Sequence, residues 1–225
     1  MWADTEAPAL GNAPEAVRDG YLRALLAADV PAARAVIDAA VTTGMSSRAI
    51  YLDVLQPALY EVGRRWSHAE ISVAQEHLAT AAAQSAMARL AEGLSTGPRR
   101  IRPGAALVAC VSDELHAVGG RMVADFLDAD GWNVVYLGQL TPSADLAAMV
   151  AEHGAQVVAL SAALPERVPR VAEVCAALRA LDPAPFVIVG GQAFGGSPER
   201  ALRTGADAFA TDAGDAVRTL QERFG

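Results

Sequence analysis

The chain has 225 residues, of which 52% are hydrophobic, so it is long enough for one or two domains with a substantial core. Its formal net charge of −8 argues against direct nucleic-acid binding, because phosphate contacts need clustered lysine and arginine. The only cysteines, Cys110 and Cys175, lie far apart in the sequence, which excludes a disulfide framework and a zinc site of the Cys-x-x-Cys type.

Residues 14–94 carry the spacing of a helical bundle. Apolar residues recur with helical periodicity from Pro14 onward, after a lead-in over residues 1–13 that is predicted to be poorly ordered. Asp29 followed by Pro31 is typical of the first turn of a second helix.

Two more helices are predicted before the pattern changes. The third starts at Ser46 or Ser47, and Pro57 inside it predicts a kink or a short break. Ser72 and Gln75 form a capping box that opens a long, alanine-rich fourth helix. Four helices joined by short connections predict a four-helix bundle.

A linker rich in proline, glycine and arginine, residues 95–104, precedes a second pattern over residues 105–225. Five buried, non-alternating apolar runs alternate there with amphipathic segments, which predicts an α/β domain with a parallel, Rossmann-like (flavodoxin-like) sheet. No G-x-G-x-x-G motif follows the first run, which argues against an ordinary dinucleotide-binding domain. The five predicted strands are Ala105–Val111, Trp132–Leu137, Gln156–Leu160, Phe186–Val189 and Ala206–Ala210.

The loop after the first predicted strand has the composition of a binding site. Glu114 lies two residues before His116, and Gly119 and Gly120 open the next helix. The carboxyl edge of a parallel sheet is where such folds bind ligands, and a carboxylate beside an imidazole orients it for a metal. The glycines allow close approach to the backbone. Taken alone, this motif is weak, and an ordinary polar loop is the simpler interpretation.

A helical bundle followed by a Rossmann-like domain with E-x-H-x-x-G after its first strand resembles the cobalamin-binding module of methionine synthases, corrinoid methyl carriers and cobalamin photoreceptors. The resemblance covers the first βα unit, residues 112–138. It implies that His116 is the lower axial ligand of cobalt, in place of the cofactor's own dimethylbenzimidazole. Glu114 stands where aspartate is commoner, which leaves the strength of its hydrogen bond to His116 open.

Two further positions agree with that family. Ser161 follows the third strand, where the family has an S-x-L motif; here the third position is Ala163 and the leucine is Leu164, so only the serine matches. Gly190 and Gly191 follow the fourth strand, where the family has a glycine pair beside the displaced nucleotide tail. The alternative for this pair is a plain strand-to-loop turn.

Trp66, Glu76 and His77 resemble the upper-face signature of cobalamin-dependent photoreceptor repressors of the CarH type, in which such residues pack around the adenosyl group. On an unbroken helix Trp66 and His77 would share a face, about three turns apart. A helix that restarts at Ser72 would still place Glu76 and His77 in its second turn. The alternative is a core tryptophan and a chance Glu-His pair on a solvated face.

One position departs from the repressors, in which a histidine directly follows the tryptophan and ligates cobalt after photolysis. Here that position is Ser67, and the next residue is His68. Either His68 or His77 reaches cobalt by a local rearrangement, or no second imidazole binds. The repressors also carry an amino-terminal DNA-binding domain that this sequence does not show, so the output is expected to act through a partner protein or a changed oligomer.

The resemblance therefore predicts a stand-alone light sensor rather than an enzyme. Adenosylcobalamin is expected to bind base-off between the bundle and the Rossmann-like domain, and photolysis to change conformation or oligomeric state. Some relatives also resemble bilin-using photoreceptors, so a bilin is left open as a second chromophore, although no residue here marks its site. The expected partners are cobalamin, an unknown downstream protein and further copies of the chain. No secretory leader or membrane-length apolar run is visible, so a cytoplasmic protein without membrane contact is expected.

The main alternative is a corrinoid methyl carrier of a methyltransferase system. It shares the bundle and the E-x-H-x-x-G motif, but Trp66 and His77 would obstruct the upper face that such a carrier must expose. A small subunit of a carbon-skeleton mutase is a weaker alternative, because these subunits lack this helical cap.

Overall fold

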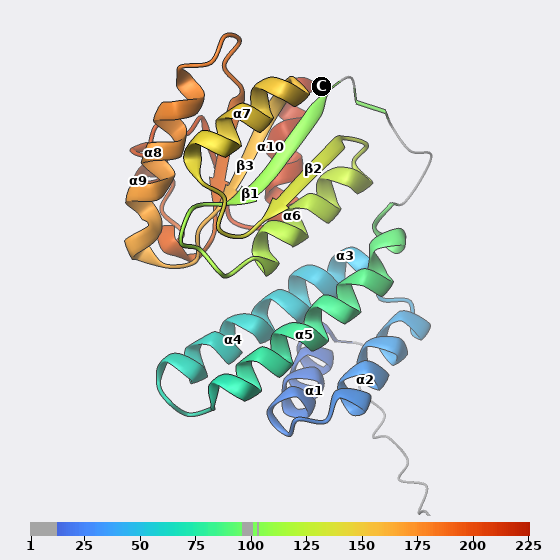
Figure 1. Ribbon diagram of the computed structural model, residues 1–225. Coiled ribbons are helices and arrows are strands. Elements are labelled where there is room, and N and C mark those ends of the chain that lie inside the picture. Colours follow the sequence, from blue (N-terminus) through green and yellow to red (C-terminus); the bar gives the residue numbers. More distant parts are fainter. Residues whose placement is uncertain (1–12, 96–100, 103) are drawn as a thin grey trace, which may run out of the picture. The chain divides into compact units, whose positions relative to one another are not determined.

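The computed structural model describes residues 13–95, 101–102 and 104–225. The chain forms two compact units, Met1–Gly93 and Leu94–Gly225, the first helical and the second α/β (Figure 1). Most of the predicted lead-in, residues 1–12, lies outside the described part of the chain, as do residues 96–100 and 103 of the predicted linker. Within the described ranges, no helix combines the length and apolar character needed to cross a bilayer.

The first unit contains the predicted helices, one of them with an irregular start. The third helix is continuous through three segments, and its middle segment is a π-helix in which Gln56 N–H bonds to Tyr51 O. Pro57, which has no N–H to donate, lies in the first turn of the α-helix that follows. The predicted break at Pro57 is therefore a change of helical winding. The helices are α1 (Pro14–Leu26), α2 (Val30–Thr42), α3 (Ser47–Ala49), η1 (Ile50–Leu55), α4 (Gln56–Ser67), α5 (Val73–Leu90) and the short η2 (Ala91–Leu94).

Small side chains line the buried face of α5. Ala79, Ala83 and Ala86 are all nearly inaccessible, which lets the other helices approach this helix closely. The buried Tyr51 fixes η1 against α5, because its hydroxyl donates to Met87 O at 2.9 Å. The alanine-rich sequence thus serves packing between helices.

Helices α4 and α5 are separate, so the continuous face that an unbroken helix would give Trp66 and His77 does not exist. Helix α4 ends at Ser67 and α5 begins after Ser72. The predicted capping box is present: Ser72 Oγ accepts from Gln75 N–H at 3.3 Å, and Gln75 Oε1 accepts from Ser72 N–H at 3.0 Å. The helix restarts because this cap satisfies its first backbone donors.

The second unit is a five-stranded parallel sheet in the order β2-β1-β3-β4-β5, with helices on both faces (Figure 1). Helices α6 and α10 cover one face, and α7, α8 and α9 cover the other. This confirms the predicted flavodoxin-like architecture. The strands are β1 (Ala105–Cys110), β2 (Asn133–Gly138), β3 (Ala155–Ser161), β4 (Phe186–Gly190) and β5 (Ala208–Ala210). The helices are α6 (Val118–Ala129), α7 (Ser143–His153), η3 (Pro165–Arg167), α8 (Val168–Arg179), η4 (Gln192–Phe194), α9 (Pro198–Leu202) and α10 (Ala213–Phe224).

The strand order reverses at the ends of β1 and β3. The chain leaves β1 toward β2 on one side and then returns to β3 on the other, and ligands of doubly wound folds bind at such a reversal. The strand ends are aligned, with Cys110 opposite Ser161 and Ser161 opposite Gly190. Three of the predicted loops therefore meet at one edge of the sheet.

Candidate functional site

An exposed imidazole and a buried carboxylate form the centre of this edge. The side chain of Glu114 is 1% exposed and that of His116 is 45% exposed. Glu114 Oε1 accepts from His116 Nδ1 at 2.5 Å and from His116 N–H at 3.0 Å. Glu114 Oε2 accepts from Ala163 N–H, in the loop after β3, at 2.8 Å. Glu114 therefore bonds both to the imidazole of its own loop and to the loop after β3.

The hydrogen bonds also determine which nitrogen of His116 carries the hydrogen. Burial raises the pKa of the Glu114 carboxyl, but the bonds from His116 and Ala163 outweigh this effect and hold the pKa at about 2. An ionised carboxylate only accepts hydrogen bonds, so Nδ1 of His116 carries the hydrogen. In the neutral ring the lone pair is on Nε2, and this is the form of a metal-binding histidine held by a carboxylate.

The neighbouring strand β2 supports the same loop. Tyr136 donates its hydroxyl hydrogen to Ala117 O at 2.9 Å, and Leu140 N–H donates to Glu114 O at 3.2 Å. Neither residue is marked by a motif in the sequence, because each acts from the next βα unit. The second βα unit therefore bonds the loop at two points: Ala117 O, one residue after His116, and Glu114 O, two residues before it.

Two leucines near His116 in the chain or in the adjoining loop are exposed. Leu115 is 62% exposed and Leu140 is 47% exposed. The backbone of Leu140 is left-handed, with φ of 60°, which costs a non-glycine residue about 1–2 kcal/mol. Strain of this kind persists where the surrounding structure enforces it and is common at ligand sites. An exposed imidazole with exposed leucines in its loop and the next fits a large, flat, partly apolar ligand.

The first turn of α6 packs closely on the ends of β1 and β3. A Cβ at Gly119 would lie 3.5 Å from Ser161 Oγ, and one at Gly120 would lie 3.4 Å from Cys110 Sγ. Both are ordinary contacts, so the packing of this unit tolerates a methyl group at either position. Ser161 therefore lies beside Gly119, while Ala163 N–H, rather than the Ser161 hydroxyl, supplies the bond to Glu114 from the β3–α8 loop.

The glycine pair at the end of β4 is required by the fold itself. A Cβ at Gly190 would lie 2.8 Å from Ala210 O, and one at Gly191 would lie 2.1 Å from Ala162 O. Gly191 also has a φ of +108°, which side chains disfavour. A strand-to-loop turn explains both glycines without a ligand, and their role beside a nucleotide tail stays a prediction. Leu164 is partly buried just before η3, and its role in binding the cofactor also stays a prediction.

In the helical unit, the predicted upper-face residues lie around the turn between α4 and α5. Trp66 is 43% exposed, which excludes the interpretation as a core tryptophan. His77 Nδ1 lies 2.6 Å from Glu76 Oε2, and Glu76 Oε1 accepts from Thr80 Oγ1 at 2.8 Å. The His77 side chain is 75% exposed. This pair repeats the carboxylate–imidazole contact of Glu114 and His116.

His68 is bound differently from His77. Its Nδ1 lies 2.8 Å from Arg64 O at the carboxyl end of α4, so the ring caps the last turn of the helix. The two histidines that the sequence offered as upper ligands are thus distinguished by their partners: a backbone carbonyl for His68 and a carboxylate for His77.

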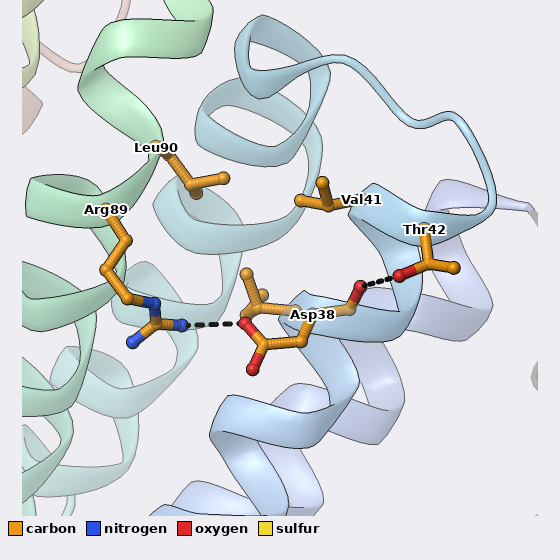
Figure 2. Close-up of a pocket in the computed structure, with 6 residues that line it drawn as sticks. Asp38, Val41, Thr42, Arg89 and Leu90 are labelled. Atoms are coloured by element: carbon orange, nitrogen blue, oxygen red, sulfur yellow. Dashed lines mark hydrogen bonds and ion pairs between the residues drawn. The ribbon is translucent and has the colours of Figure 1, made fainter.

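A hollow of about 320 Å³ lies elsewhere on the helical unit, between α2 and α5 (Figure 2). Arg89 and Asp38 form an ion pair of 3.2 Å at its edge, and Thr42 Oγ1 donates to Asp38 O at 2.8 Å. Ile37 is among its lining residues and is fully buried. The residues that line it do not include those singled out from the sequence, so it is separate from the predicted upper face.

Two protein-family models match the chain, and both are described as a B12 binding domain. One covers residues 104–221 and the other residues 17–91. The first match extends over the whole sheet and the loop of His116, and the second over the helices.

The chain is also similar to two curated relatives and to a solved structure. The chain is 35% identical over 190 residues to the HTH-type transcriptional repressor CarA of Myxococcus xanthus, covering 83% of this chain and 62% of CarA. It is 36% identical over 133 residues to the HTH-type transcriptional repressor CarH of the same organism, covering 59% of this chain and 42% of CarH. The chain thus spans less than two thirds of either relative. The monomethylamine corrinoid protein of Methanosarcina barkeri has the same fold, with a TM-score of 0.82 at 23% identity, covering 94% of this chain and 100% of that one.

Proposed function

The chain belongs to the B12-binding domain family, as a cobalamin-binding module of the CarH type, and from this premise we propose that it senses light through bound adenosylcobalamin. The Glu114–His116 pair at the carboxyl edge of the sheet carries the cobalamin part of the proposal, and the exposed Trp66 carries the sensor part. The sequence resemblance to cobalamin modules is confirmed by the family matches.

The lower face of the corrin is proposed to rest on His116. Its Nε2 points the lone pair away from the carboxylate, so it is the nitrogen offered to cobalt. Leu115 and Leu140 expose apolar surface in this loop and the next, and Gly119 has no side chain in the first turn of α6. A single oriented imidazole suits a metal that brings its other ligands in a macrocycle. These features support base-off binding with His116 as the axial ligand.

The upper face is proposed to be formed by Trp66, Glu76 and His77 around the adenosyl group. The exposure of Trp66 and His77 leaves both available for a ligand, and the carboxylate of Glu76 orients the imidazole. Adenosylcobalamin supplies a cobalt–carbon bond that visible light breaks. We propose that loss of the adenosyl contacts at Trp66 changes the conformation or the oligomeric state, and that a partner protein reads the change.

A corrinoid methyl carrier is the second candidate. The Methanosarcina barkeri corrinoid protein has the same fold, and one fold can serve both functions. The two differ in what the upper face must do, because a sensor encloses the adenosyl group whereas a carrier exposes the methyl group to its partner enzymes. The size and exposure of Trp66 favour the sensor.

The absorption spectrum of the protein, reconstituted in darkness with adenosylcobalamin and then exposed to green light, tests this function. The sensor predicts a base-off, histidine-bound spectrum in darkness and a lasting change after illumination. A spectrum that light does not alter, together with methyl transfer from a methylated donor in darkness, would instead establish the carrier. An additional band in protein purified from its natural source would reveal a bilin.

Trp66→Ala is expected to reduce the preference for adenosylcobalamin over methylcobalamin by about tenfold, because a large aromatic contact to the adenosyl group is lost. Dark titration with each cobalamin measures the preference. Tyr60→Ala is the matched control, since Tyr60 lies on the same helix and is also 43% exposed. An unchanged preference in Trp66→Ala would count against the proposed cap.

A further inference from the structure

The loop that carries His116 is fastened to β2 by a side chain with no assigned role. Tyr136 lies in β2 opposite Val108 of β1, and the pairing between the two strands shifts by one residue directly afterwards. Its hydroxyl donates to Ala117 O at 2.9 Å. The bond joins two βα units at the point where the first loop becomes helix.

Ala117 O lies where the loop of His116 joins α6. Ala117 directly follows His116 and is the N-cap residue of α6, and the same carbonyl accepts the hydrogen bond from Arg121 N–H at 2.9 Å. The Tyr136 ring also packs on this turn, because a Cβ at Gly120 would lie 3.7 Å from Tyr136 Cε2. Tyr136 thus holds the start of α6 through its hydroxyl and its ring.

The other bonds to the loop lie on both sides of His116, and one of them, from Cys110 Sγ of β1 to His116 O at 3.7 Å, is on the same side as the Tyr136 bond. Glu114 fixes the imidazole ring and the N–H of His116, and Leu140 N–H fixes the carbonyl of Glu114. On the carboxyl side of His116 the backbone is joined to β1 by the weak thiol bond from Cys110, and to β2 by the shorter bond from the Tyr136 hydroxyl. Without the bond to β2, the peptide after His116 gains freedom, and the ring moves with it.

We propose that Tyr136 is a positioning residue, whose hydroxyl bond to Ala117 O keeps the His116 imidazole aimed at cobalt. This inference rests on the proposed ligation by His116 and deepens it. The effect acts through the backbone, so Tyr136 itself need not touch the cofactor.

Tyr136→Phe removes the hydroxyl and keeps the ring. The variant is expected to bind adenosylcobalamin with a reduced histidine-bound fraction in the dark spectrum and to release it about tenfold faster, as loss of one hydrogen bond allows. Tyr51→Phe is the matched control, because Tyr51 also donates to a backbone carbonyl at 2.9 Å, but within the helical unit. Both variants are expected to lose similar thermal stability, and only Tyr136→Phe to change the spectrum and the release rate.

The outcomes separate this inference from the proposed function. A wild-type spectrum and release rate in Tyr136→Phe, while His116→Ala removes the histidine-bound spectrum, would overturn the role of Tyr136 alone. Equal spectral changes in Tyr136→Phe and Tyr51→Phe would also overturn it, because they would reflect general loosening. A histidine-bound spectrum that survives in His116→Ala would overturn both ideas.

Discussion

His116→Ala is expected to abolish the histidine-bound spectrum of adenosylcobalamin and to weaken its binding by more than about 100-fold. Loss of a residue that only orients a metal ligand costs about 10–100-fold, and loss of the ligand itself should exceed that range. The side chain is 45% exposed, so its removal leaves no cavity in the core and the apo protein should stay folded. Titration in darkness, followed by absorption, measures both effects.

The control for this prediction is His153→Ala. His153 is an exposed histidine at the end of α7, and its replacement should leave the spectrum and the affinity unchanged. If His116→Ala bound adenosylcobalamin with wild-type affinity, the assignment of the lower ligand would be wrong.

The second large effect is expected at Glu114, where Glu114→Gln should lower the free energy of unfolding of the apo protein by about 1–3 kcal/mol at neutral pH. The carboxylate accepts three hydrogen bonds in a buried setting, and a neutral amide cannot accept all of them with the same strength. The amide also cannot hold Nδ1 of His116 as firmly, so cobalamin affinity should fall by about 10–100-fold.

The difference in free energy of unfolding between the wild-type and Glu114→Gln proteins should shrink as the pH falls. The pKa of Glu114 is lowered from its ordinary value of 4.5 to about 2 in the folded protein, so its contribution is fully present above pH 4.5. It is lost as the pH falls toward 2, and the wild-type and Glu114→Gln proteins should become equally stable there. Chemical denaturation across this range measures the convergence.

Glu76→Gln provides the comparison at a more exposed carboxylate–imidazole pair. Its partner His77 is 75% exposed, and exposed pairs contribute about 0–1 kcal/mol. The stability of the apo protein should therefore change little. A Glu114→Gln protein as stable as wild type at pH 7 would contradict the account of the buried carboxylate.

The parts of the site that could be predicted from the sequence are those encoded by neighbouring residues. Glu114, His116 and Gly119 lie in one short loop after an apolar run, so their spacing indicated both the strand end and the binding loop. The single sheet with helices on both faces was predictable for the same reason, because buried strands and amphipathic helices alternate in order.

The residues that sequence reasoning missed act from other βα units. Ala163 contributes only its N–H, which any residue except proline would supply, so its identity carries no signal. Tyr136 in β2 looks like an ordinary strand residue, and its bond to Ala117 depends on how β2 is aligned with β1. Leu140 is distinguished by its left-handed backbone, which nothing in a leucine predicts.

Two details of the helical unit, the winding before Pro57 and the break before Ser72, depend on which backbone hydrogen bonds form locally. Pro57 predicted an interruption, but a π-helical stretch before it kept the third helix continuous. The break between Trp66 and His77 follows from the cap at Ser72, which the sequence had indicated as one of two arrangements.

Electron paramagnetic resonance of the protein loaded with cob(II)alamin tests most directly whether His116 binds cobalt. With histidine labelled by ¹⁵N, the nitrogen splitting of each cobalt line should change from a triplet to a doublet, and in His116→Ala it should become independent of the label. A triplet that survives the label in the wild-type protein would mean that the axial nitrogen comes from the cofactor's own base, and would contradict ligation by His116.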